Sequence, residues 1–421
     1  MRIRLLISGC LALLVTGCAS RQAAPLPGPL HAALPSVVQT GKQPVQWTQF
    51  LWGGSTTVDD DTRIITGPDG KMWYSDANGA QIIRMTMSGA RTLFPLSYNG
   101  GTLFHPEQMT VGADGKFYIL PFGVPLIGVV TTAGVLTTYA IPSGDVSYLN
   151  GITKGPDGNV WFVEQSHVAK ITPTGAITEY TFASGDTTNS QGAITVGSDG
   201  NLWVTEPGNN LLTQVNPSTG AMVSTNIDCQ GYSVVSAADK NLWVNCNFEL
   251  ARVTTGGAVT TFPTGFTVNA QPSSLAVGPD GNPWFAVTSN NVIGEFNTST
   301  DQMTIDYPPN AFNADYALTA GPDGNVWAVD SGGDIDVYII KILTVTPKNL
   351  TFTSGGSMKS ITVSENGTTS WTAKSSKTSV ATVANGSSAN IFNVTSVAAG
   401  KAQITVSDGK GNTFNVSVTV Q

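Results

Sequence analysis

The sequence predicts an all-β protein built around a seven-bladed β-propeller, and three observations support this. Gly and Pro are frequent, with 46 and 23 residues among 421, and only 11% of the residues are charged. Apolar residues occur in short alternating runs, and no long stretch carries them at helical spacing. A turn phrase, Gly-Pro-Asp-Gly-Asn at 155–159, recurs seven times with a period of about 40 to 45 residues, which is typical of propeller blades.

The N-terminal segment is expected to direct export. Two arginines precede an apolar run at 5–15 that is too short to span a membrane. The run Leu-Val-Thr-Gly-Cys at 14–18 resembles a bacterial lipobox, and the resemblance implies cleavage before Cys18 and lipid on its thiol. We therefore expect residues 1–17 to be a lipoprotein signal peptide. The mature protein would be anchored in the cell envelope and sorted to the outer membrane, facing the periplasm or the cell surface.

An Ala/Pro-rich tether is expected at 18–43, followed by the propeller at 44–343. Each turn phrase joins strand A of a blade to strand B. A large aromatic residue lies two residues after the Asn position that ends the phrase. These ring aromatics are Trp73, Tyr118, Trp161, Trp203, Trp243, Trp284 and Trp327. We assign them to packing between blades rather than to a ligand cage, because each wedge between blades needs a large apolar side chain.

The strands of a blade can be placed within one repeat. In the fourth repeat we expect strands A to D at 193–197, 201–206, 211–215 and 221–227. The seventh repeat has no D strand after its strand C. The run Val-Gln-Trp-Thr-Gln-Phe at 45–50 has the pattern of the D strands at 136–141 and 177–182. We therefore expect this N-terminal strand to close the ring, which would remove the exposed sheet edges.

Residues 344–421 lose the period and read as a small β-sandwich of short strands. The runs Ser-Val-Ala-Thr-Val at 379–383 and Ala-Gly-Lys-Ala-Gln-Ile-Thr-Val-Ser-Asp-Gly at 399–409 resemble the bacterial Ig-like domain, group 2. The resemblance implies a module of surface proteins without catalytic machinery. It could serve as a spacer or a lid on the propeller, or it could act in adhesion.

The repeats at 151–164 and 193–206 resemble the virginiamycin B lyase (streptogramin lyase) family over about residues 44–343. The resemblance implies opening of a cyclic depsipeptide by elimination, with Mg²⁺ and a His general base. It places His at the start of strand A in adjacent blades and Glu at the end of strand B. The B-end Glu is kept as Glu164 and Glu206. The strand-A positions are Thr62, Glu107, Asn150, Gly192, Tyr232, Ser273 and Tyr316, and none is His.

Candidate site residues gather at the mouth of the propeller, where the D-to-A and B-to-C loops meet. The catalytic candidates are Glu107, Asn150, Glu164 and Glu206, and the ligand candidates are Asp76, His105, His167, Tyr232, Tyr316 and Asp330. Asp76, Glu164, Glu206 and Asp330 could hold Mg²⁺ or Ca²⁺, although the sequence specifies no cofactor with certainty. Alternatively, these carboxylates pair with cations that recur at one place in strand C, namely Arg84, Lys170, Arg252 and Lys341.

Two further features bear on the cellular setting. Cys229 and Cys246 should lie near the mouth in one A/B hairpin, and in an oxidising envelope we expect them to form a disulfide. The net charge of −8 argues against nucleic acid, because no basic surface is available to neutralise phosphates. The expected partners are therefore the membrane, through lipid on Cys18, and an unidentified small molecule, glycan or peptide at the mouth.

Elimination needs a base whose pKa lies near the working pH, and His supplies one most readily. The missing strand-A histidines therefore favour a binding function. We expect a lipid-anchored propeller that serves as a platform for ligand or protein binding. The alternative is a Mg²⁺-dependent lyase or a lactone hydrolase acting at the mouth.

Overall fold

The computed structural model describes residues 47–50, 63–121, 123–144, 151–164, 166–183, 192–246, 249–265, 272–287, 292–306, 316–330, 336–340, 344–353, 355–364, 370–407 and 413–421. The expected signal peptide, the tether, Cys18 and Asn150 lie outside these ranges. Apart from one 3₁₀ turn, η1 (Pro207–Asn209), the described elements are all strands. None of the described residues forms a helix long and apolar enough to cross a membrane. The expected all-β character is confirmed.

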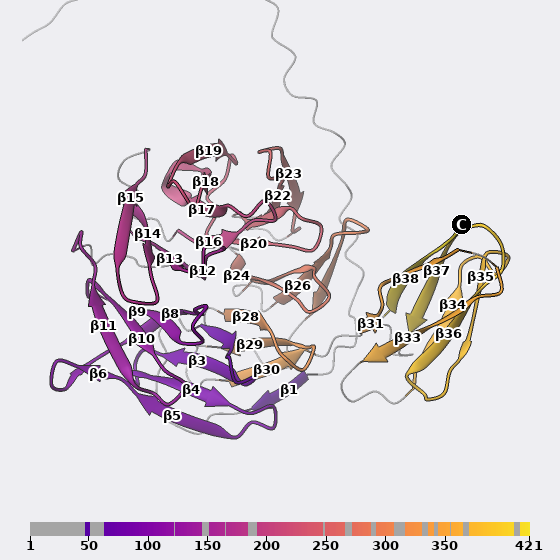
Figure 1. Ribbon diagram of the computed structural model, residues 1–421, viewed down its shortest axis with the longest axis horizontal. Helices are drawn as coiled ribbons and strands as arrows, with labels where there is room; N and C mark the ends of the chain where they lie inside the picture. The colour runs from indigo at the N-terminus through magenta and orange to yellow at the C-terminus, as the bar shows by residue number, and fades with distance from the viewer. Residues whose placement is uncertain are drawn as a thin grey trace, which may run out of the picture. The chain divides into compact units, whose positions relative to one another are not determined.

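Seven four-stranded antiparallel sheets are described between residues 47 and 340 (Figure 1). The first contains β2 (Ile64–Thr66), β3 (Met72–Asp76), β4 (Gln81–Met85) and β5 (Arg91–Pro95), and the second β8 (Pro106–Val111), β9 (Phe117–Pro121), β10 (Leu126–Val130) and β11 (Leu136–Ala140). The third contains β12 (Ile152–Lys154), β13 (Val160–Val163), β14 (His167–Ile171) and β15 (Ile177–Thr181), and the fourth β16 (Ile194–Val196), β17 (Leu202–Glu206), β18 (Leu211–Val215) and β19 (Met222–Asn226).

The remaining three sheets follow the same order of strands A to D. The fifth contains β20 (Ser233–Ser236), β21 (Leu242–Asn245), β22 (Glu249–Val253) and β23 (Val259–Pro263), and the sixth β24 (Pro272–Val277), β25 (Pro283–Val287), β26 (Val292–Asn297) and β27 (Gln302–Asp306). The seventh contains β28 (Tyr316–Ala320), β29 (Val326–Asp330), β30 (Asp336–Ile340) and β1 (Trp47–Phe50). A short hairpin, β6 (Ser97–Tyr98) and β7 (Thr102–Leu103), lies between the first two sheets in sequence.

The N-terminal strand β1 occupies the D position of the seventh sheet. It pairs antiparallel with β30, with Phe50 opposite Val337. The Phe50 ring stacks on Trp327, with 6.3 Å between ring centroids. Within the first sheet, Phe94 of β5 stacks on Trp73 in the same way at 5.1 Å. Phe50 therefore packs on the ring aromatic of the seventh sheet, as the D-strand aromatic Phe94 does in the first sheet.

Contacts join the seventh sheet to the first. Strand β2 contacts β28, and the Thr66 hydroxyl donates to the Ala320 carbonyl at 2.9 Å. The Arg91 guanidinium donates to the Phe50 carbonyl at 3.0 Å, and the Phe50 ring lies against Gly89, which has φ +86°. Both its φ and the close ring favour glycine at this position. The same contact between a D-strand aromatic and a turn glycine of the next sheet joins Phe94 to Gly134, Tyr139 to Gly175 and Tyr180 to Gly220.

The hydrophobic core of the seven sheets is divided into clusters, several of which join successive sheets. One cluster contains Tyr118 and Leu120 of the second sheet with Phe162 of the third. Another contains Tyr74 of the first sheet with Trp327 of the seventh. Each sheet thus buries apolar side chains against a neighbour rather than around a single centre.

Each turn phrase binds the ring aromatic that follows it. The Trp73 indole N–H donates to Asp69 Oδ1 at 2.8 Å. The same bond, at 2.9 to 3.3 Å, joins Trp161 to Asp157, Trp203 to Asp199, Trp243 to Asp239 and Trp327 to Asp323, and the Tyr118 hydroxyl donates to Asp114. We call this hydrogen bond the turn clasp. Trp284 departs from the pattern, because its buried Nε1 has no hydrogen-bond partner in the described part of the chain.

Two turn clasps show how charge supports the contact. Burial raises the pKa of Asp199, but hydrogen bonds from Asn201, Trp203 and Gln214 outweigh it and hold that pKa below its ordinary value. This stabilisation is present above the unfolded-state pKa of about 3.9 and is lost as the pH falls through the lower folded value. In the second sheet, burial and then the charge of Asp114 raise the pKa of Tyr118 to about 12, so its hydroxyl stays a donor at neutral pH.

Residues 344–421 form two further four-stranded sheets with a core of their own. In spatial order, one contains β31 (Thr344–Thr346), β33 (Met358–Ser364), β36 (Ile391–Ser396) and β35 (Ala381–Asn385), and the other β32 (Asn349–Phe352), β38 (Thr413–Val420), β37 (Gly400–Ser407) and β34 (Thr372–Ser375). Strands β32 and β38 pair in parallel. One cluster of buried side chains draws on both sheets, including Phe352, Ile361, Val394 and Val418.

The first glycine of the turn phrase leaves no room for a larger residue. A Cβ on Gly155 would lie 2.4 Å from Trp161 Cδ1 and 2.5 Å from Asp157 Oδ1. We predict that Gly155→Ala lowers the free energy of unfolding by about 1–3 kcal/mol, because the clasped ring must move within a close-packed core. Urea denaturation of the purified protein measures this change.

Gly256→Ala is the matched control, because a Cβ there would meet only Thr254 Oγ1, at 3.8 Å. The control should change stability by less than about 0.5 kcal/mol. An equal loss in both variants would contradict the packing role of Gly155.

Candidate functional site

The starts of strand A and the ends of strand B lie at one end of each sheet, and we call this end the mouth. The placement follows from the antiparallel A/B pairing, as in the fourth sheet, where Ile194 is opposite Val204. Tyr316 and Asp330 are paired there in the seventh sheet, but their side chains lie outside the described residues. Asn150 lies outside them entirely. The remaining candidates are described, and their contacts decide which of them come together.

Asp76 organises its own B-to-C loop. Its side chain is fully buried and accepts a hydrogen bond from the Gly79 N–H at 2.8 Å. The other carboxylate oxygen accepts from Gln81 Nε2 at 2.6 Å. Both partners lie within five residues, so Asp76 stabilises the turn between β3 and β4.

Glu206 plays a similar role in the fourth sheet. It is 2% exposed and accepts hydrogen bonds from the Thr213 hydroxyl and, at 3.4 Å, from Asn209 Nδ2. Thr213 in turn lies 2.8 Å from Ser224 Oγ. The carboxylate therefore begins a row of polar contacts that crosses β18 and β19.

Glu164 and His167 are two candidates that the structure brings together. Glu164 is 1% exposed, and its Oε2 accepts from Ser143 Oγ at 3.0 Å and lies 3.8 Å from His167 Nδ1. Ser166 Oγ lies 3.1 Å from the same imidazole nitrogen. The Glu164 N–H also donates to the His167 carbonyl at 2.8 Å, which closes the loop between β13 and β14. A buried carboxylate thus lies beside a partly exposed imidazole, but at the start of strand C rather than strand A.

Glu107 and His105 contact the first sheet. Glu107 is 6% exposed, and its carbonyl accepts from Ser75 Oγ at 2.9 Å. His105 Nδ1 lies 2.6 Å from the Ala77 carbonyl. Across the described residues, no group of three or more His, Cys, Asp or Glu side chains could hold a metal ion.

The strand-C cations do not pair with the mouth carboxylates, so the expected alternative pairing is wrong for those described. Arg84 lies 4.0 Å from Asp69, and Lys170 lies 3.7 Å from Asp157. Both of these partners are turn-clasp aspartates. Arg252 instead binds Asp301 at 2.9 Å. Each cation also lies over its ring aromatic, with 5.0 to 5.8 Å to Trp73, Trp161 or Trp243, and this placement explains the recurrence of these cations in strand C.

Sequence reasoning missed three buried polar residues that fix the start of strand A. Ser75 Oγ accepts from the Arg63 N–H at 2.8 Å, and Thr205 Oγ1 accepts from the Ala193 N–H at 2.8 Å. Asn245 Oδ1 accepts from the N–H groups of Tyr232 and Ser233. A signal was available, because all three lie two residues after the ring aromatic, where other repeats have Leu120, Val163, Ala286 and Val329.

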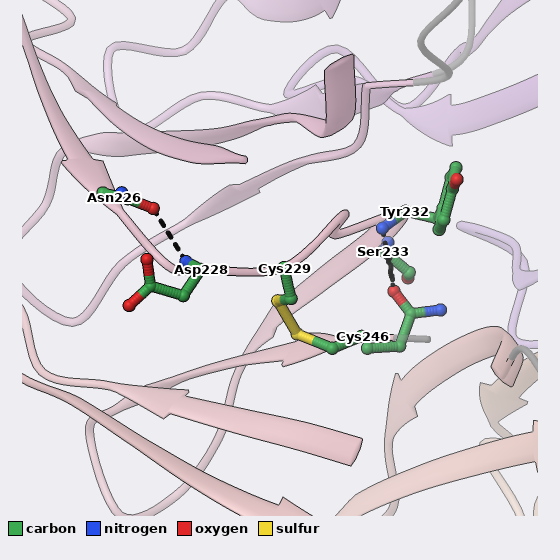
Figure 2. The surroundings of a disulfide bond; sticks show 7 residues. Asn226, Asp228, Cys229, Tyr232, Ser233 and Cys246 are labelled. Atoms are coloured by element: carbon green, nitrogen blue, oxygen red, sulfur yellow. Dashed lines mark hydrogen bonds between the residues drawn. A yellow bond between two sulfur atoms is a disulfide. The ribbon is translucent and has the colours of Figure 1, made fainter. Parts of the chain in front are cut away.

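A disulfide joins Cys229 to Cys246 at the mouth of the fifth sheet (Figure 2). The two Cα atoms are 5.6 Å apart, and Cys246 is 1% exposed. Tyr232 lies a short distance along the same loop, and its hydroxyl donates to Gln230 Oε1 at 2.8 Å. The fifth sheet therefore has a covalent bond at the B-end position that Glu164 and Glu206 occupy elsewhere.

We predict that Glu206→Ala lowers the free energy of unfolding by about 1–3 kcal/mol, to the same extent with and without Mg²⁺. The reason is that Thr213 and Asn209 bind this carboxylate in the described structure. Thermal and urea unfolding with Mg²⁺ or EDTA measure the loss. Glu249→Ala, at a half-buried position, is the control and should cost less. A loss seen only with Mg²⁺ would show that the carboxylate binds the ion instead.

Comparison with known proteins shows which family this chain resembles. The virginiamycin B lyase family model matches residues 55–230 and 184–342. The structure of selenomethionine-substituted virginiamycin B lyase from Staphylococcus aureus is similar, with a TM-score of 0.61 and 24% identity over 70% of this chain and 99% of that one. A catalytically inactive histidine-to-alanine variant of that enzyme with quinupristin matches with a TM-score of 0.60 and 26% identity, over 70% of this chain and all of that one.

More distant likeness extends to extracellular domains of bacterial proteins. The extracellular domain of a hybrid two-component system from B. thetaiotaomicron has a TM-score of 0.54 and 12% identity, over 89% of this chain and 57% of that one. That likeness shows the fold alone. No curated protein sequence matches this chain significantly. The family model covers well over half of the chain, so the protein belongs to the virginiamycin B lyase family.

Proposed function

We propose that this protein is a lipid-anchored cell-envelope protein whose propeller binds a ligand or protein partner at its mouth and has no streptogramin lyase activity. The observation that carries the proposal is the state of the B-end carboxylates. Asp76 is bonded within its own loop, Glu206 to Thr213 of the following strand, and Glu164 to Ser143. Carboxylates committed in this way position loops, which is what a binding surface requires.

The chemistry of elimination supports the same conclusion. A base must reach a substrate proton with its pKa near the working pH, and no strand-A start in this sequence is His. His167 lies beside Glu164, but at the start of strand C. Among the described residues, no group of three or more His, Cys, Asp or Glu side chains comes together. Binding at the mouth needs no catalytic step through a metal.

We further propose that the seven sheets are the blades of one closed ring. The pairing of β1 with β30, the Thr66–Ala320 hydrogen bond and the Phe50–Gly89 contact support closure. We propose that residues 344–421 are an Ig-like module that serves as a spacer. The shared core of its two sheets supports an independent folding unit.

The envelope location is supported by two independent considerations. The N-terminal sequence resembles a lipoprotein signal with Cys18 as the lipidated residue. The similar B. thetaiotaomicron structures are extracellular domains of a hybrid two-component system and a one-component system, which agrees with a location outside the cytoplasm. A lipid anchor followed by the Ala/Pro-rich tether would hold the propeller near the membrane surface.

We predict that the purified protein does not linearise quinupristin in the presence of Mg²⁺, because the strand-A starts contain no His general base. Mass spectrometry of the antibiotic after incubation measures ring opening. The Staphylococcus aureus virginiamycin B lyase, assayed in parallel, is the positive control. Ring opening by this protein, lost in Glu164→Gln or His167→Ala, would overturn the proposal and favour the enzymatic alternative.

Replacing Cys18 by Ala should move the protein from the membrane fraction to the soluble envelope fraction, because the stable anchor depends on lipid at that residue. Fractionation and immunoblotting of the native host measure this. Cys10→Ala, in the apolar run of the signal, is the control and should leave the protein with the membrane. Membrane retention of the Cys18→Ala protein would rule out the lipid anchor.

A further inference from the structure

The third and fifth sheets tie together the same two positions at the mouth. In the third sheet, Ser143 is the third residue after β11 and Glu164 is the first after β13. Ser143 Oγ donates to Glu164 Oε2 at 3.0 Å. In the fifth sheet, Cys229 is the third residue after β19 and Cys246 is the first after β21, and their sulfur atoms are bonded. The same two positions of the repeat are therefore joined by a hydrogen bond in the third blade and by a disulfide in the fifth.

The surrounding backbone is also equivalent in the two sheets. The Glu164 N–H donates to the His167 carbonyl at 2.8 Å, and the Cys246 N–H donates to the Glu249 carbonyl at 2.9 Å. Both B-to-C loops therefore close in the same way beside the joined pair. In both blades this pair of positions ties the D-to-A loop to the end of strand B. The third blade does so with a polar contact, and the fifth blade does so with a disulfide.

The disulfide acts on a short loop at 227–232, which we call the mouth loop (Figure 2). At its start, the Asp228 N–H donates to Asn226 Oδ1 at 2.8 Å, and Asp228 has φ +57°. At its end, the N–H of Tyr232 donates to Asn245 Oδ1 at 3.1 Å. Between these ends, the disulfide joins Cys229 of the loop to Cys246, the first residue after β21. Asp is one of the few non-glycine residues that adopt the left-handed region, and here the hydrogen bond to Asn226 fixes the backbone of Asp228.

The strands of the fifth sheet are held by pairing and packing that lie outside the mouth loop. Strands β20 and β21 pair from Ser233 opposite Asn245 to Ser236 opposite Leu242. Val234, Leu242 and Val244 are buried in a hydrophobic cluster, which Ile227 of the mouth loop also joins. Loss of the covalent bond should therefore release the mouth loop while the strands stay paired.

We propose that the Cys229–Cys246 disulfide is a redox-sensitive latch that holds the mouth loop, and with it Tyr232, in place at the propeller mouth. The mouth would have this shape only where the disulfide is oxidised, as in the envelope outside the cytoplasm. Reduction by a thiol reductant would free the loop and change the surface that the fifth blade presents. The third blade, with its Ser143–Glu164 hydrogen bond, would not respond.

The burial of the two sulfur-bearing residues sets the direction of attack. Cys246 is 1% exposed, whereas Cys229 is only partly buried. A reductant thiolate therefore attacks the Cys229 sulfur and forms a mixed disulfide there, and Cys246 leaves as the thiolate and takes up a proton. A second reductant thiol then displaces Cys229 as its thiol, so two electrons and two protons pass from two reductant thiols to the protein, and the reductant becomes a disulfide.

Hydrogen exchange of the full-length protein, with and without dithiothreitol, tests the latch. We expect the Tyr232 and Ser233 amides to exchange at least about 10-fold faster after reduction. The reason is that the mouth loop can then open locally without being held by the Cys229–Cys246 disulfide. The Glu164 and Phe182 amides of the third blade are the internal control and should not change. Unchanged exchange at Tyr232 and Ser233 would overturn the proposal, and so would loss of protection throughout all seven sheets.

Variants separate the latch from other effects of the reductant. Cys229→Ser with Cys246→Ser should show fast exchange at Tyr232 both with and without dithiothreitol, and circular dichroism should confirm retained strand content. A response to reductant that persists in this double variant would assign the effect to something other than the disulfide and contradict the proposal.

The route of attack has its own readout. Brief treatment with glutathione, followed by alkylation and peptide mass spectrometry, should place glutathione on Cys229 and the alkyl group on Cys246. The reverse labelling would overturn the assigned direction of attack.

Discussion

The hydrogen bond between each ring aromatic and the aspartate of its turn phrase is the contact on which the rest of the propeller depends. The same carboxylate binds the turn itself, as when Asp157 accepts from the Asn159 N–H at 3.2 Å and from Trp161 at 3.0 Å. One side chain therefore fixes both the A-to-B turn and the indole that fills the wedge beside the next blade. The first glycine of the phrase must be small because that indole lies directly on it. Cations such as Lys170 are placed over the ring and near the carboxylate, which adds a second attraction to the same unit.

The copies that deviate show how far the unit can be altered. In the fifth copy Ala237 replaces the first glycine, and Trp243 lies 3.2 and 3.3 Å from the two Asp239 oxygens. There the indole packs against the rings of Phe262 and Phe296, at 5.5 and 4.6 Å. Aromatic packing of this kind is worth about 0.5–1.5 kcal/mol per pair, comparable to the net value of a hydrogen bond. The fifth repeat thus keeps both its clasp and the packing of its indole although it has lost the two glycines.

The difference between the repeated turn clasps and the individual contacts at the mouth also explains what the sequence could predict. The turn phrases and ring aromatics are repeated, so their period locates the sheets, and the D-strand pattern of residues 45–50 pointed to the partner of β30. The partners of the mouth carboxylates could not be predicted in the same way. Asp76 binds Gln81 and Glu206 binds Thr213, and both partners are ordinary residues of strand C that no period marks. The strand-C cations were misassigned for a related reason, because linear position did not show that Arg84 and Lys170 reach toward the turn phrase.

The residues at the mouth therefore differ from one repeat to the next while the fold of the repeats stays the same. The physical reason is the location of the turn clasps. Each clasp lies in the A-to-B turn, at the end of the sheet opposite the starts of A and the ends of B. Substitutions at the mouth therefore leave the clasps, and the ring aromatics that they hold, in place. At one B-end position this chain has Asp76, Glu164, Glu206 and Cys246, and each makes a different local connection. A position that has a carboxylate in one blade and a disulfide in another connects neighbouring segments of the chain in each. Membership of the family therefore carries the architecture of the propeller to this protein, whereas its activity has to be argued from the mouth residues themselves.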